Sequence, residues 1–234
     1  EGRFVASSIF ENKMQSQLQN NNFAILYRTN AQSRSFEDAL RKKNISYRVY
    51  GGLSFYQRKE IKDVLAYLRL LINPDDEQAF KRIINFPARG IGQTTLNKIA
   101  VEAKNSSVSD YIFIKDLLKS SEILNNSTKN KLLDFVIMIE SIKNKIEHAD
   151  VFDITKEVLK QSGLYNLYKN DESLEGINRI QNIEELLNGI KDFVENNEKS
   201  QASVSSFLQD VALATDQDND CLLYTSDAAD ESTG

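Results

Sequence analysis

The segment at residues 26–34 carries a cation and an amide in positions suited to anion binding. Its sequence is LYRTNAQSR, and it overlaps the end of a short apolar run at 23–27. The guanidinium of Arg28 can hold a phosphate, and the side chain of Asn30 can bond a phosphate, a sugar or a base edge. A helix that begins here adds unpaired N–H groups and the positive end of its dipole. The alternative interpretation is a solvated strand-to-helix turn in which Asn30 caps the helix.

A second segment, residues 50–63, combines glycines, aromatic rings and cations. Its sequence is YGGLSFYQRKEIKD. Glycines allow the backbone to approach a ligand closely, and rings beside cations suit stacking against a single-stranded nucleic acid. Taken alone, this segment fits a strand-to-helix turn with two packed aromatic side chains better.

A third segment, residues 86–96, contains a Gly-Ile-Gly turn at 90–92 and has the sequence FPARGIGQTTL. Such a turn before a helix presents consecutive N–H groups to a phosphate, and the hydroxyl of Thr94 adds a donor. Arg89 and Lys98 supply positive charge. A hairpin of this kind between helices grips a DNA backbone without reading its bases. The flanking Arg and Thr residues carry this inference, because a bare Gly-x-Gly is weak evidence.

The elements expected to position these segments are a short α/β unit and a series of helices after it. Apolar runs at 23–27 and 47–50 predict buried strands. A helix is expected over 30–44, and an apolar stripe at 61–72 predicts a second one. Strand, helix, strand and helix in succession indicate an α/β unit with a parallel sheet. Only helical stripes follow residue 85, so we place a domain boundary there.

Charge is unevenly distributed along the chain. Residues 1–104 contain 17 Lys/Arg and 10 Asp/Glu, a balance of +7, whereas residues 105–234 balance at −12. Six acidic residues and no basic one lie between Asp216 and the last residue. A basic first part favours a polyanionic partner for that part only.

Composition excludes several classes of protein. A single cysteine rules out a disulfide scaffold and a cysteine-built metal site, and a single histidine rules out most histidine-dependent catalysis and zinc chemistry. No apolar run approaches the roughly 20 residues of a membrane span, and the N-terminus lacks a signal-peptide pattern. We therefore expect a cytoplasmic protein without a membrane partner. The chain opens on Glu1 and has its first methionine at Met14, so we expect a fragment of something longer.

In their order and spacing, the three segments together resemble the UvrD/PcrA/Rep family of superfamily 1 DNA helicases. The similarity carries specific motifs from residue 23 to residue 95 and continues more loosely to about residue 214. Within the looser part, QSGL at 161–164 and RIQNIEE at 179–185 look like landmarks of the family.

The resemblance implies a fold and two DNA-binding surfaces. Residues 1–84 would be the first part of the second RecA-like motor domain (2A), an α/β unit with an incomplete parallel sheet. Residues 85–220 would be its all-α insertion (2B), which makes the chain mainly helical overall. Carried over by motif, Arg28 and Asn30 would contact the translocating single strand. The positions that match the family's helix-hairpin-helix-like GIG element, which holds duplex DNA, are Gly90, Ile91, Gly92 and Thr94.

The parent implied by the resemblance is an ATP-dependent DNA helicase that moves 3'-to-5' in repair or replication and uses ATP and Mg²⁺. This chain contains no GxxxxGK[S/T] phosphate loop and no acidic pair in a Walker-B context. We therefore expect no catalytic, cofactor or metal site in it and no ATPase activity of its own. Two alternatives stay open: the matching region of a helicase-nuclease, and a stand-alone helix-hairpin-helix DNA-binding module without a motor.

The C-terminal stretch departs from the family pattern. From Cys221 onward the sequence is CLLYTSDAADESTG, which resembles the translation of a sequencing-library adapter. We expect residues 221–234 to be non-native, with a disordered acidic terminus as the alternative.

Overall fold

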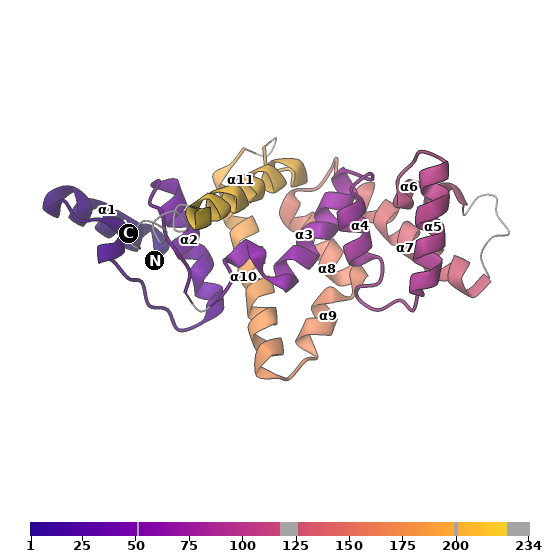
Figure 1. Ribbon diagram of the computed structural model, residues 1–234, viewed down its shortest axis with the longest axis horizontal. Coiled ribbons are helices and arrows are strands. Elements are labelled where there is room, and N and C mark those ends of the chain that lie inside the picture. The colour runs from indigo at the N-terminus through magenta and orange to yellow at the C-terminus, as the bar shows by residue number, and fades with distance from the viewer. Residues whose placement is uncertain (51, 118–125, 199–200, 224–234) are drawn as a thin grey trace, which may run out of the picture.

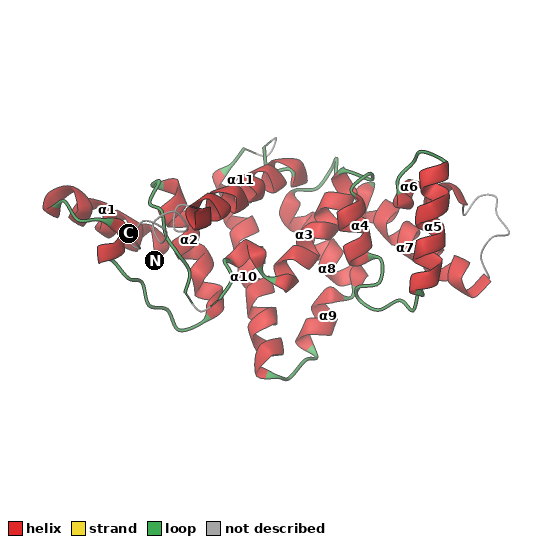
Figure 2. Cartoon of the chain, in the orientation of Figure 1, coloured by secondary structure: helices red, strands yellow, loops and turns green. Residues whose placement is uncertain are grey.

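The computed structural model describes residues 1–50, 52–117, 126–198 and 201–223, and every regular element in these ranges is a helix (Figures 1 and 2). The α-helices are α1 (Gly2–Ser16), α2 (Ser33–Lys42), α3 (Lys59–Ile72), α4 (Glu77–Ile83), α5 (Gln93–Asn105), α6 (Asp110–Leu117), α7 (Asn126–Lys143), α8 (Val151–Ser162), α9 (Leu164–Lys169), α10 (Leu174–Asn196) and α11 (Val204–Leu223). Three short 3-10 turns are η1 (Asn20–Asn22), η2 (Asn30–Gln32) and η3 (Phe55–Gln57).

The prediction of an α/β RecA-like unit with a partial parallel sheet is wrong, because the described residues contain no strand. Residues 23–27 alternate between half-buried and exposed side chains, as a strand does, and Leu26 is 95% exposed. Alternation reports an extended backbone, but a sheet also needs a neighbouring strand to receive its hydrogen bonds. The other predicted strand, at 47–50, does not pair with this segment. Both are extended connections between helices.

The helices form an elongated row (Figure 1). α1 and α2 lie at one end, α5, α6 and α7 lie at the other, and α3, α8 and α10 occupy the middle. α11 runs across the top of this view, between α2 and the central helices, and contacts both α3 and α8.

α3 is the central helix of the core. Ten of its residues are buried, from Glu60 to Leu71, so it is covered on nearly all sides rather than along one stripe. It contacts α4, α7, α8, α10 and α11. The main core extends from Phe55 to Ala214, and a small second cluster of Ala6, Ala39, Leu40 and Ile45 joins α1 to α2.

The domain limits expected from the sequence, 1–84, 85–220 and 221–234, stay predictions. The main core crosses residue 85, since it includes Ile84 on one side and Ile91 on the other. The prediction for the last segment falls mainly on residues 224–234, which lie outside the described residues. Within the described ranges, no helix combines the length and the apolar character needed to cross a membrane.

Candidate nucleic-acid interface

Arg28 and Asn30 lie on an exposed turn whose backbone is fixed by hydrogen bonds. The side-chain oxygen of Gln32 accepts from the N–H groups of Arg28 (2.9 Å) and Thr29 (3.2 Å). Tyr27, the residue before Arg28, stacks on Phe36 with ring centroids 6.3 Å apart. No side-chain hydrogen bond or ion pair to another described residue engages the Arg28 guanidinium or the Asn30 amide. Both side chains are therefore exposed donors on an ordered backbone.

Arg58 lies beneath this turn and is only 8% exposed. Its guanidinium donates to the main-chain carbonyl of Asn30 (2.7 Å), the hydroxyl of Ser33 (2.9 Å) and the side-chain oxygen of Asn182 (2.8 Å). Burial lowers the pKa of Arg58, although the nearby carboxylates of Glu37 and Glu60 act in the opposite direction. From the sequence, Arg58 was one of the cations of the second segment that suit a nucleic acid. In the structure its guanidinium is bonded inside the protein instead.

Arg34 is a second arginine whose charge is satisfied inside the protein. It donates to Glu185 of α10 (2.8 Å) and to Asp38 of α2 (2.9 Å), and its side chain is 9% exposed. Burial acts to lower the pKa of Arg34, but the two carboxylates outweigh that effect and leave it above its ordinary value. This residue ties α2 to α10 and does not face a ligand.

The aromatic residues of the second segment divide into packed and exposed rings. Phe55 and Tyr56 are buried and meet edge to face, with centroids 5.3 Å apart. Burial raises the pKa of Tyr56 well above its ordinary value. The interpretation of two packed aromatics therefore holds for this pair. Tyr50 is 80% exposed, with the guanidinium of Arg48 lying 5.2 Å from its ring centroid.

The Gly-Ile-Gly turn leaves the start of α5 exposed to solvent, and its central residue, Ile91, anchors the turn in the core. Ile91 is 2% exposed and belongs to the core, and the amide side chain of Asn85 bonds both its N–H (3.2 Å) and its carbonyl. Gly90 adopts a φ of +66°, which favours glycine, and its carbonyl accepts from the Lys131 ammonium (2.9 Å). The buried Ile91 side chain cannot itself touch DNA in this arrangement.

Gly92 and Thr94 lie exposed at the N-terminus of α5, where Gly92 is the capping residue. The N–H groups of Gly92, Gln93 and Thr94 find no acceptor within the described part of the chain, as is usual for the first turn of a helix. Unpaired N–H groups, a helix dipole and a threonine hydroxyl together suit a phosphate.

Arg89 does not supply free charge to this turn. Its guanidinium donates to the carbonyls of Ile83 (2.8 Å) and Ile84 (3.1 Å) at the end of α4, and to the hydroxyl of Tyr67 (2.7 Å). It also lies 5.0 Å from the ring centroid of Phe135. Arg89 therefore holds α4, α3 and α7 together, and Lys98 is the exposed cation of the two that the sequence proposed.

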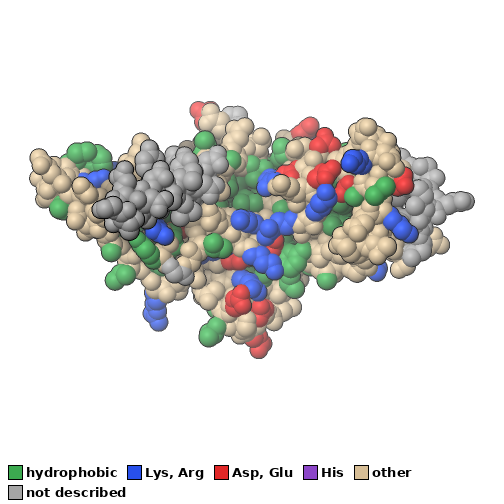
Figure 3. Space-filling model, viewed as in Figure 1, with side chains coloured by type: hydrophobic (Ala, Val, Ile, Leu, Met, Phe, Trp, Pro, Cys, Tyr) green, Lys and Arg blue, Asp and Glu red, His purple; other side chains and the backbone are tan. Residues whose placement is uncertain are grey.

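One helix connects the two candidate contacts. The N-cap of α3 is Arg58, which bonds the Asn30 turn, and Tyr67 of the same helix bonds Arg89 beside the Gly-Ile-Gly turn. Tyr67 comes nine positions after Arg58, which corresponds to about 14 Å along the helix axis. Lys and Arg side chains gather over the middle of the face shown in Figure 3, where α3, α9 and α10 meet.

A pocket of about 460 Å³ opens between α3, α9 and α10. Its lining includes Lys59 and Arg179, but Arg179 pairs with Glu175 and lies 3.8 Å from Asp171, which also lines the pocket. Because the lining carries both positive and negative side chains, this pocket is not a specific anion-binding site. Among the described residues, no three His, Cys, Asp or Glu side chains gather as metal ligands would.

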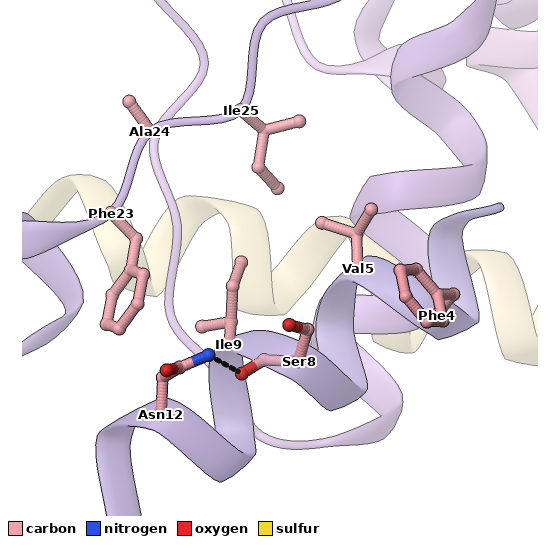
Figure 4. Close-up of a pocket in the computed structure, with 8 residues that line it drawn as sticks. All are labelled: Phe4, Val5, Ser8, Ile9, Asn12, Phe23, Ala24 and Ile25. Carbon is pink, nitrogen blue, oxygen red and sulfur yellow. Dashed lines mark hydrogen bonds between the residues drawn. The ribbon is translucent and has the colours of Figure 1, made fainter. Parts of the chain in front are cut away.

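A smaller pocket of about 210 Å³ lies between α1 and the extended segment at 23–25 (Figure 4). Its lining is mostly apolar, with Ile9 and Val5 of α1 below Ile25 in the view. The side-chain amide of Asn12 donates to the carbonyl of Ser8 (2.7 Å) at its edge. None of the lining residues is charged, so this pocket is a gap in packing and not a phosphate site.

Comparison with known proteins identifies the family. Residues 1–226 match the UvrD-like helicase C-terminal domain. Over 220 residues the chain is 40% identical to the ATP-dependent DNA helicase PcrA of Bacillus subtilis, and 36% identical to the proteins of the same name from Staphylococcus epidermidis and Staphylococcus aureus. These alignments cover 93% of this chain but only 29% or 30% of each relative. The chain belongs to the UvrD-like helicase C-terminal domain family.

Proposed function

We propose that this chain is the part of an ATP-dependent DNA helicase that contacts single-stranded DNA at Arg28 and Asn30 and duplex DNA at the start of α5. The observation that carries the proposal is the pairing of exposed, unbonded side chains with a fixed backbone at the 28–30 turn. The relatives are named as ATP-dependent DNA helicases, which supports DNA as the ligand. ATP and Mg²⁺ would be used by the whole helicase, moving 3'-to-5' in repair or replication.

The two contacts suit different forms of DNA. A guanidinium and an amide side by side can hold a phosphate and a base or sugar of one strand, which fixes the register of that strand. The start of α5 offers main-chain N–H groups and the hydroxyl of Thr94, which bind a phosphate whatever the sequence. Helix α3 supports both turns and so links the two contacts. Movement of the helicase motor domains would then act on the single strand while the start of α5 holds the duplex.

Substituting Arg28 and Gly92 in the intact helicase that carries this segment tests the proposal. Arg28→Ala removes one phosphate contact, so we expect weaker binding to a single-stranded oligonucleotide and a salt dependence shallower by about 0.7. Nucleotide binding should be unchanged. Unwinding should fall together with single-strand binding.

Gly92→Ala tests close approach of a phosphate to α5. A Cβ at Gly92 meets nothing within 4 Å, and its φ of −70° is open to alanine, so folding should be preserved. The added methyl would stand where a phosphate meets the N–H groups, so we expect roughly tenfold weaker binding to a duplex junction and unchanged single-strand binding. Wild-type affinities and unwinding in both variants would overturn the proposal.

A further inference from the structure

Arg58 stands between the candidate single-strand contact and α10, and it touches both. Its donors reach the carbonyl of Asn30 (2.7 Å) on one side and the side-chain oxygen of Asn182 (2.8 Å) on the other. A further bond to the hydroxyl of Ser33 (2.9 Å) completes the fork. Three partners in fixed directions suit the planar fork of a guanidinium better than the single ammonium of a lysine.

The burial of Arg58 separates its role from that of Arg28. At 8% exposure, and with its donors bonded inside, the Arg58 guanidinium does not face DNA. Its partner at Asn30 is the main-chain carbonyl, which also accepts from the Ser33 hydroxyl (3.0 Å). Arg58 therefore fixes the backbone from which the exposed Asn30 side chain projects.

α10 supplies the other half of this network from a distant part of the chain. Asn182 is 3% exposed and donates to the carboxylate of Glu60 (2.5 Å) while it accepts from Arg58. One helical turn further along α10, Glu185 accepts from Arg34 (2.8 Å). Arg34 of the first segment and Arg58 of the second are thus bonded to neighbouring turns on one face of α10. A shift of α10 would therefore disturb both arginines.

We propose that Arg58 is a positioning residue for the single-strand contact at Arg28 and Asn30, and that Asn182 makes this contact depend on the placement of α10. The inference rests on the proposed function, and it adds a link between the single-strand contact and α10 through buried side chains. Removing Arg58 loosens the turn without removing a phosphate contact. Affinity for a single strand then falls because the free turn samples geometries that do not bind.

The test is single-strand binding by the intact helicase, measured over a range of salt concentrations. Arg58→Ala should weaken the affinity about tenfold, within the range found for residues that act through others. The slope of log affinity against log salt should stay at the wild-type value, whereas Arg28→Ala makes it shallower by about 0.7. Arg69→Ala is the matched control, since Arg69 lies on α3 and pairs with Asp76 at the far end of that helix. Its affinity should equal that of the wild type.

A double-substitution cycle separates positioning from general loss of structure. In a background that carries Arg28→Ala and Asn30→Ala, Arg58→Ala should have little further effect, because the contact that it positions is already gone. Asn182→Ala should behave like Arg58→Ala in each experiment, and it serves in its place if the arginine variant does not fold.

Three results would overturn the inference. These are a shallower salt slope in Arg58→Ala, an equal loss of affinity in the background without Arg28 and Asn30, or wild-type affinity in both Arg58→Ala and Asn182→Ala. Failure of the proposed function looks different, because single-strand binding by the wild type would then not depend on Arg28 at all.

Discussion

Replacing Arg89 by methionine distinguishes a structural arginine from one that binds DNA. Methionine keeps an apolar stem of similar length and removes every donor of the guanidinium. In the protein these donors reach the carbonyls of Ile83 and Ile84 at 2.8 and 3.1 Å and the hydroxyl of Tyr67 at 2.7 Å. The substitution leaves those acceptors without their partner in a half-buried position.

The expected loss of stability follows from these contacts. A hydrogen bond to a charged group contributes about 1.5–3 kcal/mol, and the bonds of one guanidinium do not add in full. We therefore expect Arg89→Met to lower the free energy of unfolding by about 3 kcal/mol. For a chain of this size that corresponds to a fall in Tm of roughly 6–12 °C, measurable by circular dichroism or urea unfolding.

Lys98→Met is the matched control. Lys98 is exposed, and no ion pair to another described residue involves it. Its replacement should change stability by no more than about 0.5 kcal/mol. If Lys98 neutralises a duplex phosphate, the salt dependence of duplex binding should become shallower by about 0.9. The reasoning is refuted if Arg89→Met keeps the wild-type Tm and instead makes the salt dependence of duplex binding shallower.

Two further substitutions test a half-buried carboxylate and a buried hydroxyl. Burial of Glu140 favours its neutral form, but hydrogen bonds from Lys115 and Tyr111 (2.9 and 2.8 Å) prevail and lower its pKa below the ordinary value of 4.5. The stabilisation from ionised Glu140 is therefore complete above pH 4.5 and is lost as the pH falls through the lowered pKa. Glu140→Gln should thus reduce the free energy of unfolding more at pH 7 than at pH 3. An equal reduction at both pH values would contradict this. Ser54 has a buried hydroxyl without a partner among the described residues, so Ser54→Ala should keep the wild-type Tm or raise it; a fall of several degrees would show an unseen partner.

Local patterns predicted the helices well because a helix is bonded within itself. The stripe at 61–72 predicted a helix, and α3 spans Lys59–Ile72. The cap of the next helix is equally local, since the carboxylate of Asp76 accepts from the N–H of Ala79 (2.9 Å). Side chains three and four residues apart share one face, so the sequence alone contains what the helix requires.

The predicted sheet failed for the converse reason. Residues 23–27 have the alternation of a strand, with Phe23 and Ile25 half-buried and Leu26 exposed. A strand becomes part of a sheet only through bonds to a second strand, which can lie anywhere in the sequence. A short apolar run therefore indicates an extended segment and leaves the partner strand undetermined.

The arginines show most directly what a linear pattern omits. Arg28, Arg34, Arg58 and Arg89 all lie in the segments that suggested nucleic-acid binding, and nothing in their immediate sequence separates them. Three of them are neutralised or hydrogen-bonded inside the protein, in two cases by residues more than 120 positions away along the chain. The charge balance of the first 104 residues therefore overstates the positive charge available to DNA. The salt dependence of binding should therefore count exposed cations such as Arg28, whereas Arg34 and Arg58 should influence affinity only through the geometry that they maintain.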